Sequence, residues 1–303
     1  MISIIKQRKI WFVISGLLVV SSLVVIFAWG LRLGIDFTGG SILEIEFSQQ
    51  SPTNTEIITA LQSLTIGTVT VQQSEASVLI RFAAADEETH QKILNTLSDT
   101  FANQGQNAIT EKRFDSIGPS IGAELKEKTI WGMTIVVIAI IIYISWAFRK
   151  VSQPVSSWKY GLIAVVALTH DVIITTGVFA VLGVVYGVEI NAPFVAAILT
   201  ILGYSVNDTI VVFDRTRENL KRHFGKDFGE VVDESIQQVI TRSINASVTT
   251  LVVLLAILLL GGSTVRDFVL ALIIGISIGT YSSIFVASPL LVTWHRFKNK
   301  PTN

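Results

Sequence analysis

Long apolar runs bounded by charged or turn residues recur along the chain. A hydrocarbon core about 30 Å thick needs roughly 20 mostly apolar residues in a helix that crosses it. Six runs reach this length, and they cover residues 10–29, 130–148, 161–185, 194–213, 244–260 and 268–293. The pattern therefore predicts an α-helical membrane protein with six transmembrane helices. The first run is too long for a signal-peptide core, and no A-x-A cleavage pattern precedes Arg32, so we expect a retained anchor.

Basic residues near the ends of these runs predict the orientation of the chain. They gather before the first run, between the second and third, after the fourth, and at the C-terminal end (Lys6, Arg8, Lys9; Arg149, Lys150, Lys159; Arg215, Arg217, Lys221, Arg222, Lys226; Arg296, Lys298, Lys300). The short loops on the other side are residues 187–191 and 261–267, and Arg266 is the only Lys or Arg residue in them. Glu189, in the first of these loops, is expected to face solvent. Because loops rich in Lys and Arg stay inside, we expect both termini to be cytoplasmic.

The segment between the first two helices, residues 31–129, is then predicted to lie outside as a separate domain. It carries seven Lys and Arg against thirteen Asp and Glu, whereas the whole chain has 23 of each kind. The predicted domains are an N-terminal flank with the first helix (1–30), the outer domain (31–129), helices two to four (130–213), a cytoplasmic linker (214–243), helices five and six (244–294) and a tail (295–303).

The outer domain has the pattern of a small α+β fold. Residues 41–47 alternate apolar and polar side chains, which is typical of a half-buried strand. Thr53 followed by Glu56 resembles the start of a capped helix. Further strands are predicted at 68–72, 77–82 and 108–114, and a second helix at 86–102. The order β-α-β-β-α-β is the ferredoxin-like arrangement.

Composition agrees with a membrane protein and excludes several other classes. Half of the residues are hydrophobic, 15% are charged and the mean hydropathy is +0.59, well outside the range of soluble proteins. The formal net charge of zero gives no general attraction to nucleic acid, so no nucleic-acid partner is expected. With no cysteine, the chain has no disulfide, no thiolate nucleophile and no cysteine-based metal site. No cofactor or metal is expected.

Ionisable residues at membrane depth are the first candidates for chemistry, because a charge there costs at least about 2.5–3.5 kcal/mol. Asp208 lies five residues inside the cytoplasmic end of the fourth helix, where it could take up and release a proton. Arg242 is predicted at the same depth on the fifth helix and is the expected partner of Asp208. Two plainer interpretations stay open: Asp208 hydrogen-bonded only to its neighbours, and Arg242 reaching the headgroups.

A second candidate is the pair His170 and Asp171, about ten residues into the third helix and near the middle of the bilayer. The two side chains could extend a proton relay from Asp208. Alternatively, they satisfy each other or a facing hydroxyl, since neighbouring residues on a helix point about 100° apart.

Small residues recur at every fourth position of the last helix, at Ala271, Gly275, Gly279, Ser283 and Ala287. Such a stripe lets two helix backbones approach closely where lipid gives no hydrophobic driving force. We expect a helix-packing face that includes Gly275, Gly279 and Ser283, directed either inward or toward another subunit.

The linker contains a further helical pattern. Apolar residues of segment 225–242 recur at helical spacing among acidic and amide residues. An amphipathic helix lying on the membrane surface fits this pattern, and an ordinary connector fits nearly as well.

The six helices show no internal repeat, so the chain could be one half of a paired transporter. A soluble domain after the first of six helices is also the layout of half an RND-type transporter.

Several motifs resemble the SecF family, a subunit of the bacterial SecDF accessory complex of the general secretion pathway. They are Gly34-Ile35-Asp36-Phe37-Thr38-Gly39-Gly40, Asp115-Ser116-Ile117-Gly118-Pro119, His170-Asp171, Gly203-Tyr204-Ser205-Val206-Asn207-Asp208 with the residues to Arg215, and Arg242-Ser243-Ile244-Asn245. The resemblance extends over nearly the whole chain.

The resemblance implies a location in the bacterial inner membrane and a heterodimer with SecD, forming a twelve-helix RND-like unit. That unit would work beside the SecYEG channel, with YajC and YidC as further candidate partners, and use the proton gradient to draw an exported preprotein across. By position, Asp208 is implied in proton transfer, with Arg242 near it and Asp171 having a weaker claim. Some relatives use sodium instead.

Two rival functions remain at this point. Asp171 and Asp208 on consecutive helices could form an intramembrane aspartyl protease, although a G-x-G-D element around Asp208 is missing and the two depths differ. A passive membrane assembly scaffold would use the outer domain and the stripe only to bind partners. A non-enzymatic role in export is the function we expect.

Overall fold

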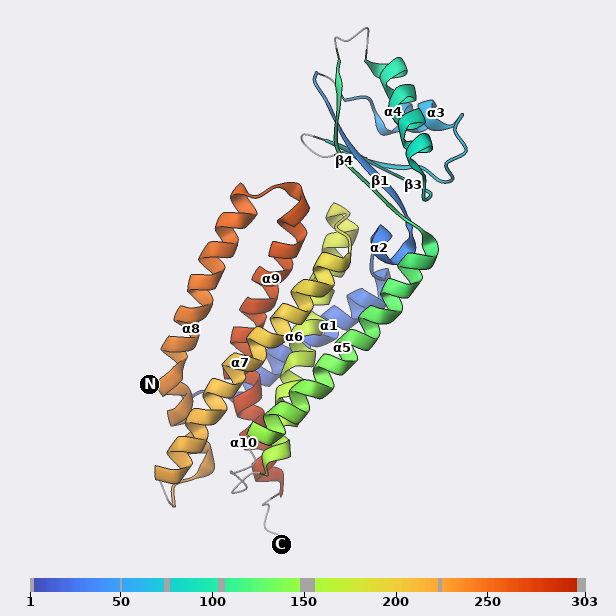
Figure 1. The fold of residues 1–303 in the computed structure, drawn as a ribbon. Coiled ribbons are helices and arrows are strands. Elements are labelled where there is room, and N and C mark those ends of the chain that lie inside the picture. The colour runs from blue at the N-terminus through green and yellow to red at the C-terminus, as the bar shows by residue number, and fades with distance from the viewer. Residues whose placement is uncertain are drawn as a thin grey trace. The chain divides into compact units, whose positions relative to one another are not determined.

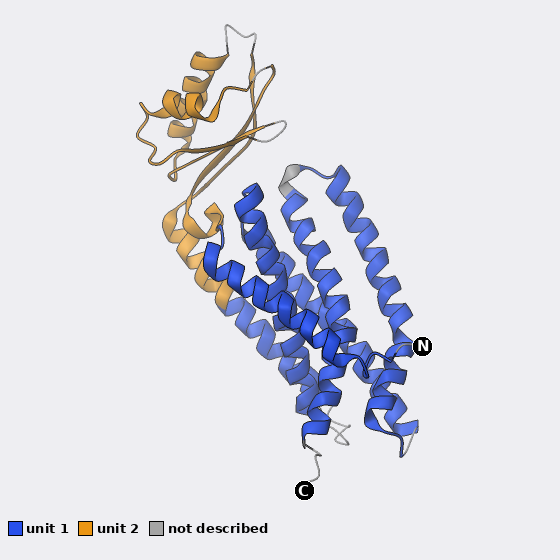
Figure 2. Ribbon diagram, turned by 180° about the vertical axis from the view of Figure 1, so that it is seen from behind, with its two compact units in different colours: residues 1–32, 131–303 blue, residues 33–130 orange. Residues whose placement is uncertain are grey.

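The computed structural model describes residues 3–49, 51–73, 77–102, 107–147, 156–222 and 225–298. The chain divides into two compact units, residues 1–32 with 131–303 (unit 1) and residues 33–130 (unit 2) (Figure 2). Unit 1 is helical, whereas unit 2 contains a sheet. The boundaries of unit 2 lie within two residues of those predicted for the outer domain.

Unit 2 contains a four-stranded antiparallel sheet with two helices on one face (Figure 1). Its elements are β1 (Gly40–Phe47), α3 (Asn54–Leu61), β2 (Thr70–Gln73), β3 (Val78–Phe82), α4 (Glu87–Phe101) and β4 (Ile109–Ile117). The strand order is β2-β3-β1-β4. The predicted β-α-β-β-α-β fold is therefore confirmed.

The alternation read in the sequence decides which face of this sheet the helices cover. Leu43 and Ile45 of β1 are fully buried, whereas the intervening Glu44 is only partly covered. Residues at helical spacing supply the opposing layer, and Ile57 of α3 and Ile93 of α4 are also fully buried. The predicted capping box is present as well: the Thr53 hydroxyl accepts from the backbone of Glu56, and the Glu56 carboxylate accepts from the backbone of Thr53.

The stability of the first turn of α4 is predicted to depend on pH. Asp86 is the N-cap, and its pKa lies below the usual range because Thr89 hydrogen-bonds to the carboxylate, with the Thr89 backbone N–H donating at 3.0 Å. The ionised Asp86 therefore stabilises α4 above its unfolded-state pKa of about 3.9, and this contribution is lost as pH falls through the lower folded value. We expect Asp86→Ala to speed amide exchange in the first turn of α4 at pH 6 but not below the folded pKa.

Exposed Asp99, near the end of the same helix, offers a matched control. Exchange rates corrected for the intrinsic effect of pH should not change in Asp99→Ala. Equal protection of the first turn in Asp86→Ala and the unsubstituted chain at pH 6 would show that the cap does not stabilise the helix.

The glycine-rich segment before β1 makes a tight turn beside the start of α5 (Pro119–Ala147). After the short helix α2 (Ile35–Thr38), Gly39 and Gly40 have φ values of 73° and 125°, which side chains rarely tolerate. A Cβ on Gly39 would also lie 2.7 Å from the Cα of Pro119. Close approach and positive φ together explain why this turn needs glycine.

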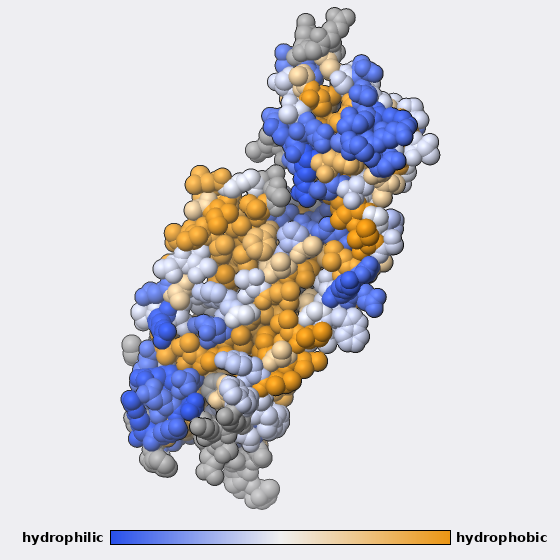
Figure 3. All heavy atoms as spheres, viewed as in Figure 1, coloured by the Kyte–Doolittle hydropathy of each residue, from blue (hydrophilic) through white to orange (hydrophobic). Residues whose placement is uncertain are grey.

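Unit 1 is a bundle of long helices (Figure 1). They are α1 (Arg8–Trp29), α5 (Pro119–Ala147, which begins in unit 2), α6 (Ser157–Tyr186), α7 (Ala192–Arg222), α8 (Phe228–Leu260) and the consecutive α9 (Ser263–Ser282), η2 (Ser283–Ala287) and α10 (Ser288–Lys298). In the described part of the chain six helices are long and apolar enough to cross a membrane, which agrees with the six predicted spans. Figure 3 shows the broad hydrophobic surface of these helices, with hydrophilic residues gathered where α7 and α8 meet.

Most of the helices are longer than the apolar runs that predicted them. Helix α5 starts 11 residues earlier than the predicted run, at Pro119, because proline is well suited to a first helical position and the charged residues after it are good helix formers. Helix α7 likewise continues past the membrane-length segment to Arg222. Hydropathy marks the part of a helix that fits lipid, and polar helical extensions are not visible to it.

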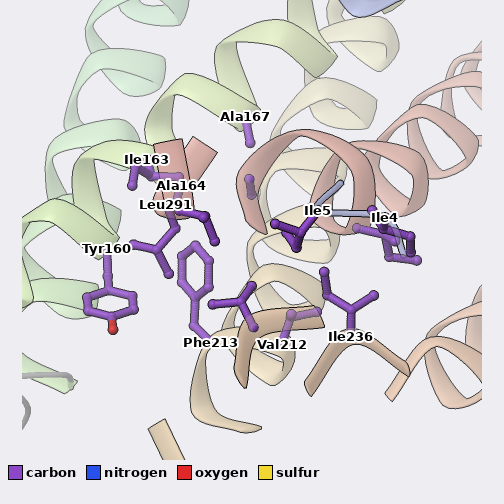
Figure 4. Packing of buried hydrophobic residues seen from close by; sticks show 14 of the residues in the cluster. Ile4, Ile5, Tyr160, Ile163, Ala164, Ala167, Val212, Phe213, Ile236 and Leu291 are labelled. Carbon is purple, nitrogen blue, oxygen red and sulfur yellow. The ribbon is translucent and has the colours of Figure 1, made fainter. Parts of the chain in front are cut away.

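The linker does not form a surface helix. Residues 228–243 are the first half of the continuous helix α8, and Val231, Val232 and Ile236 are fully buried within the protein. Val232 and Ile236 pack in a core that also contains Ile5 from the N-terminal segment and Phe213 of α7 (Figure 4). The expected amphipathic pattern is correct, but its apolar face covers protein rather than lipid.

The loop between α6 and α7 also differs from expectation. Glu189 was expected in solvent, yet it is only 9% exposed and forms an ion pair with Arg32 at 3.6 Å between Nε and Oε1. The backbone of the same segment is tied in place, since the Ile190 N–H donates to the Arg32 carbonyl at 2.8 Å. A charged loop residue can be buried when an arginine from a distant part of the chain pairs with it. The composition of the loop alone does not reveal such a partner.

Candidate functional site: two buried carboxylates

Asp171 on α6 is fully enclosed by hydrogen-bond donors. Its side chain has no exposed surface. Its Oδ2 atom accepts from the hydroxyls of Ser205 on α7, at 2.6 Å, and Ser282 at the end of α9, at 2.9 Å. The Nδ1 atom of His170 lies 2.9 Å from Oδ1. Two hydroxyls and one ring nitrogen, from three helices, therefore converge on one carboxylate, as the burial of a polar group requires.

Of the two ring nitrogens of the neighbouring His170, one is hydrogen-bonded to Asp171 and the other is not hydrogen-bonded among the described residues. With Nδ1 bonded to Asp171, its Nε2 atom is buried and has no hydrogen-bond partner in the described part of the chain. The ring lies nearly parallel to Tyr281, with centroids 6.3 Å apart, and the Tyr281 hydroxyl contacts Ser15 of α1 at 3.0 Å. The histidine can thus accept a proton on Nε2 while Asp171 holds the other nitrogen.

Asp208 on α7 is also held by hydroxyl groups. It is 9% exposed. Ser243 of α8 donates to Oδ1 at 2.5 Å, and Ser283 at the start of η2 donates to Oδ2 at 2.7 Å. No cation contacts this carboxylate in the part of the chain that the structure describes. Hydroxyls can turn to donate or accept, so this surrounding suits both the charged and the protonated acid.

The expected direct contact between Asp208 and Arg242 is not found among the described residues. Arg242 is exposed, and it is the adjacent Ser243 that faces Asp208. The arginine lines a crevice of about 480 Å³ together with Asp214, Arg215 and Gln238. The residues that line the crevice come from α5, α7 and α8, and both apolar and charged side chains are among them. Arg242 in this lining is the sequence neighbour of Ser243, which donates to Asp208.

The stripe of small residues on α9 and η2 faces inward. A Cβ on Gly275 would lie 2.1 Å from the Cδ1 of Ile201, and one on Gly279 would lie 2.9 Å from the Cβ of Ser205, both on α7. Ala271, Ser283 and Ala287 on the same stripe have no exposed surface. Close packing of these helices brings Ser282 and Ser283 to the two carboxylates.

Three of the serine donors were not predicted to bind the carboxylates: Ser205 and Ser282 were not singled out, and Ser283 was assigned to packing. A signal was present, because serines within apolar helices must find hydrogen-bond partners and mark polar interfaces. Their abundance in these helices hides which of them face an acid.

Asp171 and Asp208 are held separately by hydrogen bonds within the helix bundle. Among the described residues, no group of three His, Asp or Glu side chains could hold a metal ion. Asp171 and Asp208 each bind separate serines, so the geometry does not show two carboxylates sharing one proton. The structure thus shows two buried acids and, beside Asp171, a histidine whose buried Nε2 atom has no hydrogen-bond partner in the described part of the chain.

Comparison with known proteins places the chain in a family. Residues 96–297 match the family Protein export membrane protein SecD/SecF, C-terminal, and residues 24–51 match the SecD/SecF GG Motif. The chain belongs to the SecD/SecF family. The second match contains the Gly39-Gly40 turn that packs against Pro119.

Similar SecD/SecF proteins match over most of their length. The chain is 41% identical to Protein translocase subunit SecF of Thermobaculum terrenum, covering 97% of this chain and 94% of that protein. It is 38% identical to the subunit of the same name from Anaerolinea thermophila, with the same coverage. These matches include the segments that carry both buried acids.

Solved structures of SecDF share the fold. The crystal structure of SecDF from Thermus thermophilus, described as a translocon-associated membrane protein, matches with a TM-score of 0.83 and 32% identity. That match covers 99% of this chain but 39% of the SecDF chain. SecDF in a super-membrane-facing form matches with a TM-score of 0.69. The chain thus spans about two fifths of the length of SecDF.

Proposed function

We propose that this chain is the SecF-type subunit of an accessory complex that uses the proton-motive force to promote late steps of protein export across the bacterial inner membrane. It would pair with SecD beside the SecYEG channel. Both termini would lie in the cytoplasm and unit 2 outside, where it could meet the emerging preprotein. Asp208 would be the group that takes up and releases the proton.

The observation that carries this proposal is the surrounding of Asp208. The acid is nearly buried in a membrane helix, its two oxygens are bound by uncharged hydroxyls, and Arg242, next in sequence to one of these donors, lines a crevice with other charged residues. Buried acids within membrane helices usually mark ion or proton pathways. We infer that protons from the cytoplasmic side would approach Asp208 from this crevice.

The energy available is sufficient to bias helix packing. One charge that crosses a potential of ~150 mV releases about 3.5 kcal/mol. A conformational change can use this energy only if the protonated and ionised forms of Asp208 favour different packings. Because Ser243 and Ser283 come from α8 and η2, the protonation state of Asp208 acts on the contacts between three helices.

The test is export driven by a proton gradient. In inverted membrane vesicles that contain SecD, SecYEG and the export ATPase, Asp208→Asn should insert and assemble with SecD but lose most of the gradient-dependent part of preprotein translocation. Asparagine keeps the size and a hydrogen-bonding oxygen, so the loss reports on the titratable proton.

Glu230→Gln is the matched control. Glu230 is exposed in the first turn of α8 and does not belong to the residues that line the crevice, so its loss should leave gradient-dependent export unchanged. Normal export by Asp208→Asn at normal abundance would reject the proton role.

One observation favours the passive scaffold as a second candidate. Both carboxylates have donors on each oxygen, as acids with a purely structural role also would. A scaffold predicts that Asp208→Asn, which keeps the packing, exports normally with or without a gradient. The same vesicle experiment therefore separates the two functions.

A further inference from the structure

Two neighbouring hydroxyl groups on the last membrane helix bind two different acids. Ser282 donates to Oδ2 of Asp171 at 2.9 Å, and Ser283 donates to Oδ2 of Asp208 at 2.7 Å. Both serines have no exposed surface. The acids lie on different helices, α6 and α7, so this pair of residues is a direct structural link between them.

The link occurs where the helix changes its hydrogen-bonding pattern. Ser282 is the last residue of α9, and Ser283 is the first residue of the π-helical turn η2. The hydroxyl of Ser288 donates to the Ser283 carbonyl at 3.0 Å, which joins the two ends of this turn. A π-turn is a rare conformation that often occurs at functional sites, and it has a nearby alternative in the regular α-helix.

Each of the two hydroxyls has one proton and two acceptors within reach. Besides its carboxylate, Ser282 can donate to the Gly279 carbonyl at 3.2 Å, and Ser283 to the Thr280 carbonyl at 3.0 Å. An ionised carboxylate is the stronger acceptor, whereas a protonated one competes less well and can itself donate. Neutralising either acid therefore favours return of its serine to the carbonyl of its own helix.

We propose that Ser282 and Ser283 are positioning residues that couple the protonation of Asp171 to that of Asp208 through the π-turn. When one acid is neutralised, its serine is released, the turn relaxes, and the hydrogen bond between the other serine and the other acid changes. The biological use of this coupling rests on the proposed proton role of Asp208. The coupling itself is a property of the two protonation equilibria and can be measured without export.

The elements around the pair show where such a change would act. The ionisable groups packed beside the two acids or their donors are His170 on α6 and Tyr281 on α9, whereas Arg242 of α8 is exposed and lines the crevice. Beyond η2 the chain continues as α10, whose Leu291 is fully buried in the core shared with Ile5. A shift of the turn would thus be transmitted to the packing at the end of the bundle that bears the termini.

The test measures the protonation of each acid by infrared spectroscopy of its carboxyl group. The full chain, assembled with its SecD partner in lipid vesicles, is titrated, and the bands lost in Asp208→Asn and Asp171→Asn identify the two acids. Ser282→Ala does not touch Asp208, yet it should shift the titration midpoint of Asp208 by roughly half a pH unit or more. Ser283→Ala should likewise shift the midpoint of Asp171.

Ser205→Ala is the matched control for this experiment. Ser205 donates to the same oxygen of Asp171 as Ser282 does, but it lies on α7 and not on the turn. A simple charge effect from a perturbed Asp171 would act equally in both variants. Coupling through the π-turn requires a clearly larger shift at Asp208 in Ser282→Ala, and equal shifts in the two variants would overturn the proposal.

Two further variants protect the test against trivial outcomes. Ser277→Ala removes an exposed serine of α9 that, among the described residues, bonds only to its own helix, at 2.7 Å to the Ile273 carbonyl, and should shift neither midpoint. If Ser282→Ala does not assemble, Ser282→Cys keeps a weaker donor and should give a smaller shift of Asp208 in the same direction; no shift would contradict the coupling. The experiment measures protonation rather than export. The coupling can therefore be confirmed or rejected independently of the proposed function.

Discussion

Replacing Gly275 by leucine should prevent the bundle of unit 1 from packing. A single Cβ at this position would already lie 2.1 Å from the Cδ1 and 2.5 Å from the Cγ1 of Ile201. Ile201 is fully buried and cannot turn away into solvent or lipid. Overpacking of a tight interface costs about 1–3 kcal/mol or more, and here it would also separate Ser282 and Ser283 from the acids. We expect a large loss of monodisperse, folded protein after extraction in mild detergent.

Gly203→Leu is the control for this substitution. Gly203 lies on α7, close in sequence to Ile201, and no atom lies within 4 Å of a Cβ built there. The same change of side chain should therefore be tolerated, with yield and thermal unfolding close to those of the unsubstituted chain. Similar behaviour of the two variants would mean that the close approach of α9 to α7 does not determine stability.

The second large effect concerns Asp171. Asp171→Leu should strongly destabilise the protein, because Ser205, Ser282 and Nδ1 of His170 would lose their shared acceptor in a buried site. Each buried donor left unpaired costs about 1–3 kcal/mol. Asp171→Asn keeps an acceptor oxygen and the size of the side chain, so most of the stability should remain.

Thermal unfolding of the detergent-solubilised chain separates these outcomes. The unfolding midpoint should fall far more in Asp171→Leu than in Asp171→Asn. Leucine is the more hydrophobic residue, so a site that served only for apolar packing in the membrane would show the opposite order. That order would remove Asp171 from the account as a hydrogen-bonded acid.

Much of the fold could be predicted because its periodicities are local. The six helices follow from runs of apolar residues, and the sheet of unit 2 follows from two-residue alternation such as that of Leu43, Glu44 and Ile45. The capping pattern of Thr53 marked a helix start correctly, and the helix predicted from residue 86 begins at Glu87, with Asp86 as its N-cap. The π-turn at Ser283 could not be predicted, since its residues are compatible with a regular helix and the turn depends on tertiary contacts.

The sequence predicted how far along its helix each site residue lies, but not toward which neighbouring helix its side chain points. Hydropathy gives how far a residue lies along a helix, and it correctly marked Asp171 and Asp208 as acids within membrane-length helices. It does not give which face of α8 turns toward α7. Because neighbouring residues point about 100° apart, Ser243 contacts Asp208 while Arg242 faces the crevice. A one-residue difference thus replaced the expected ion pair by a hydroxyl contact.

The movement of protons through Asp208 is the central claim, and it can be measured directly. Vesicles that contain the chain, SecD and SecYEG are loaded with a pH-sensitive dye and exposed to a proton gradient while a preprotein is being exported. We predict faster proton entry than in vesicles without the chain, reduced to that background by Asp208→Asn and unchanged by Glu230→Gln. Proton entry at the unsubstituted rate in Asp208→Asn vesicles would contradict the account.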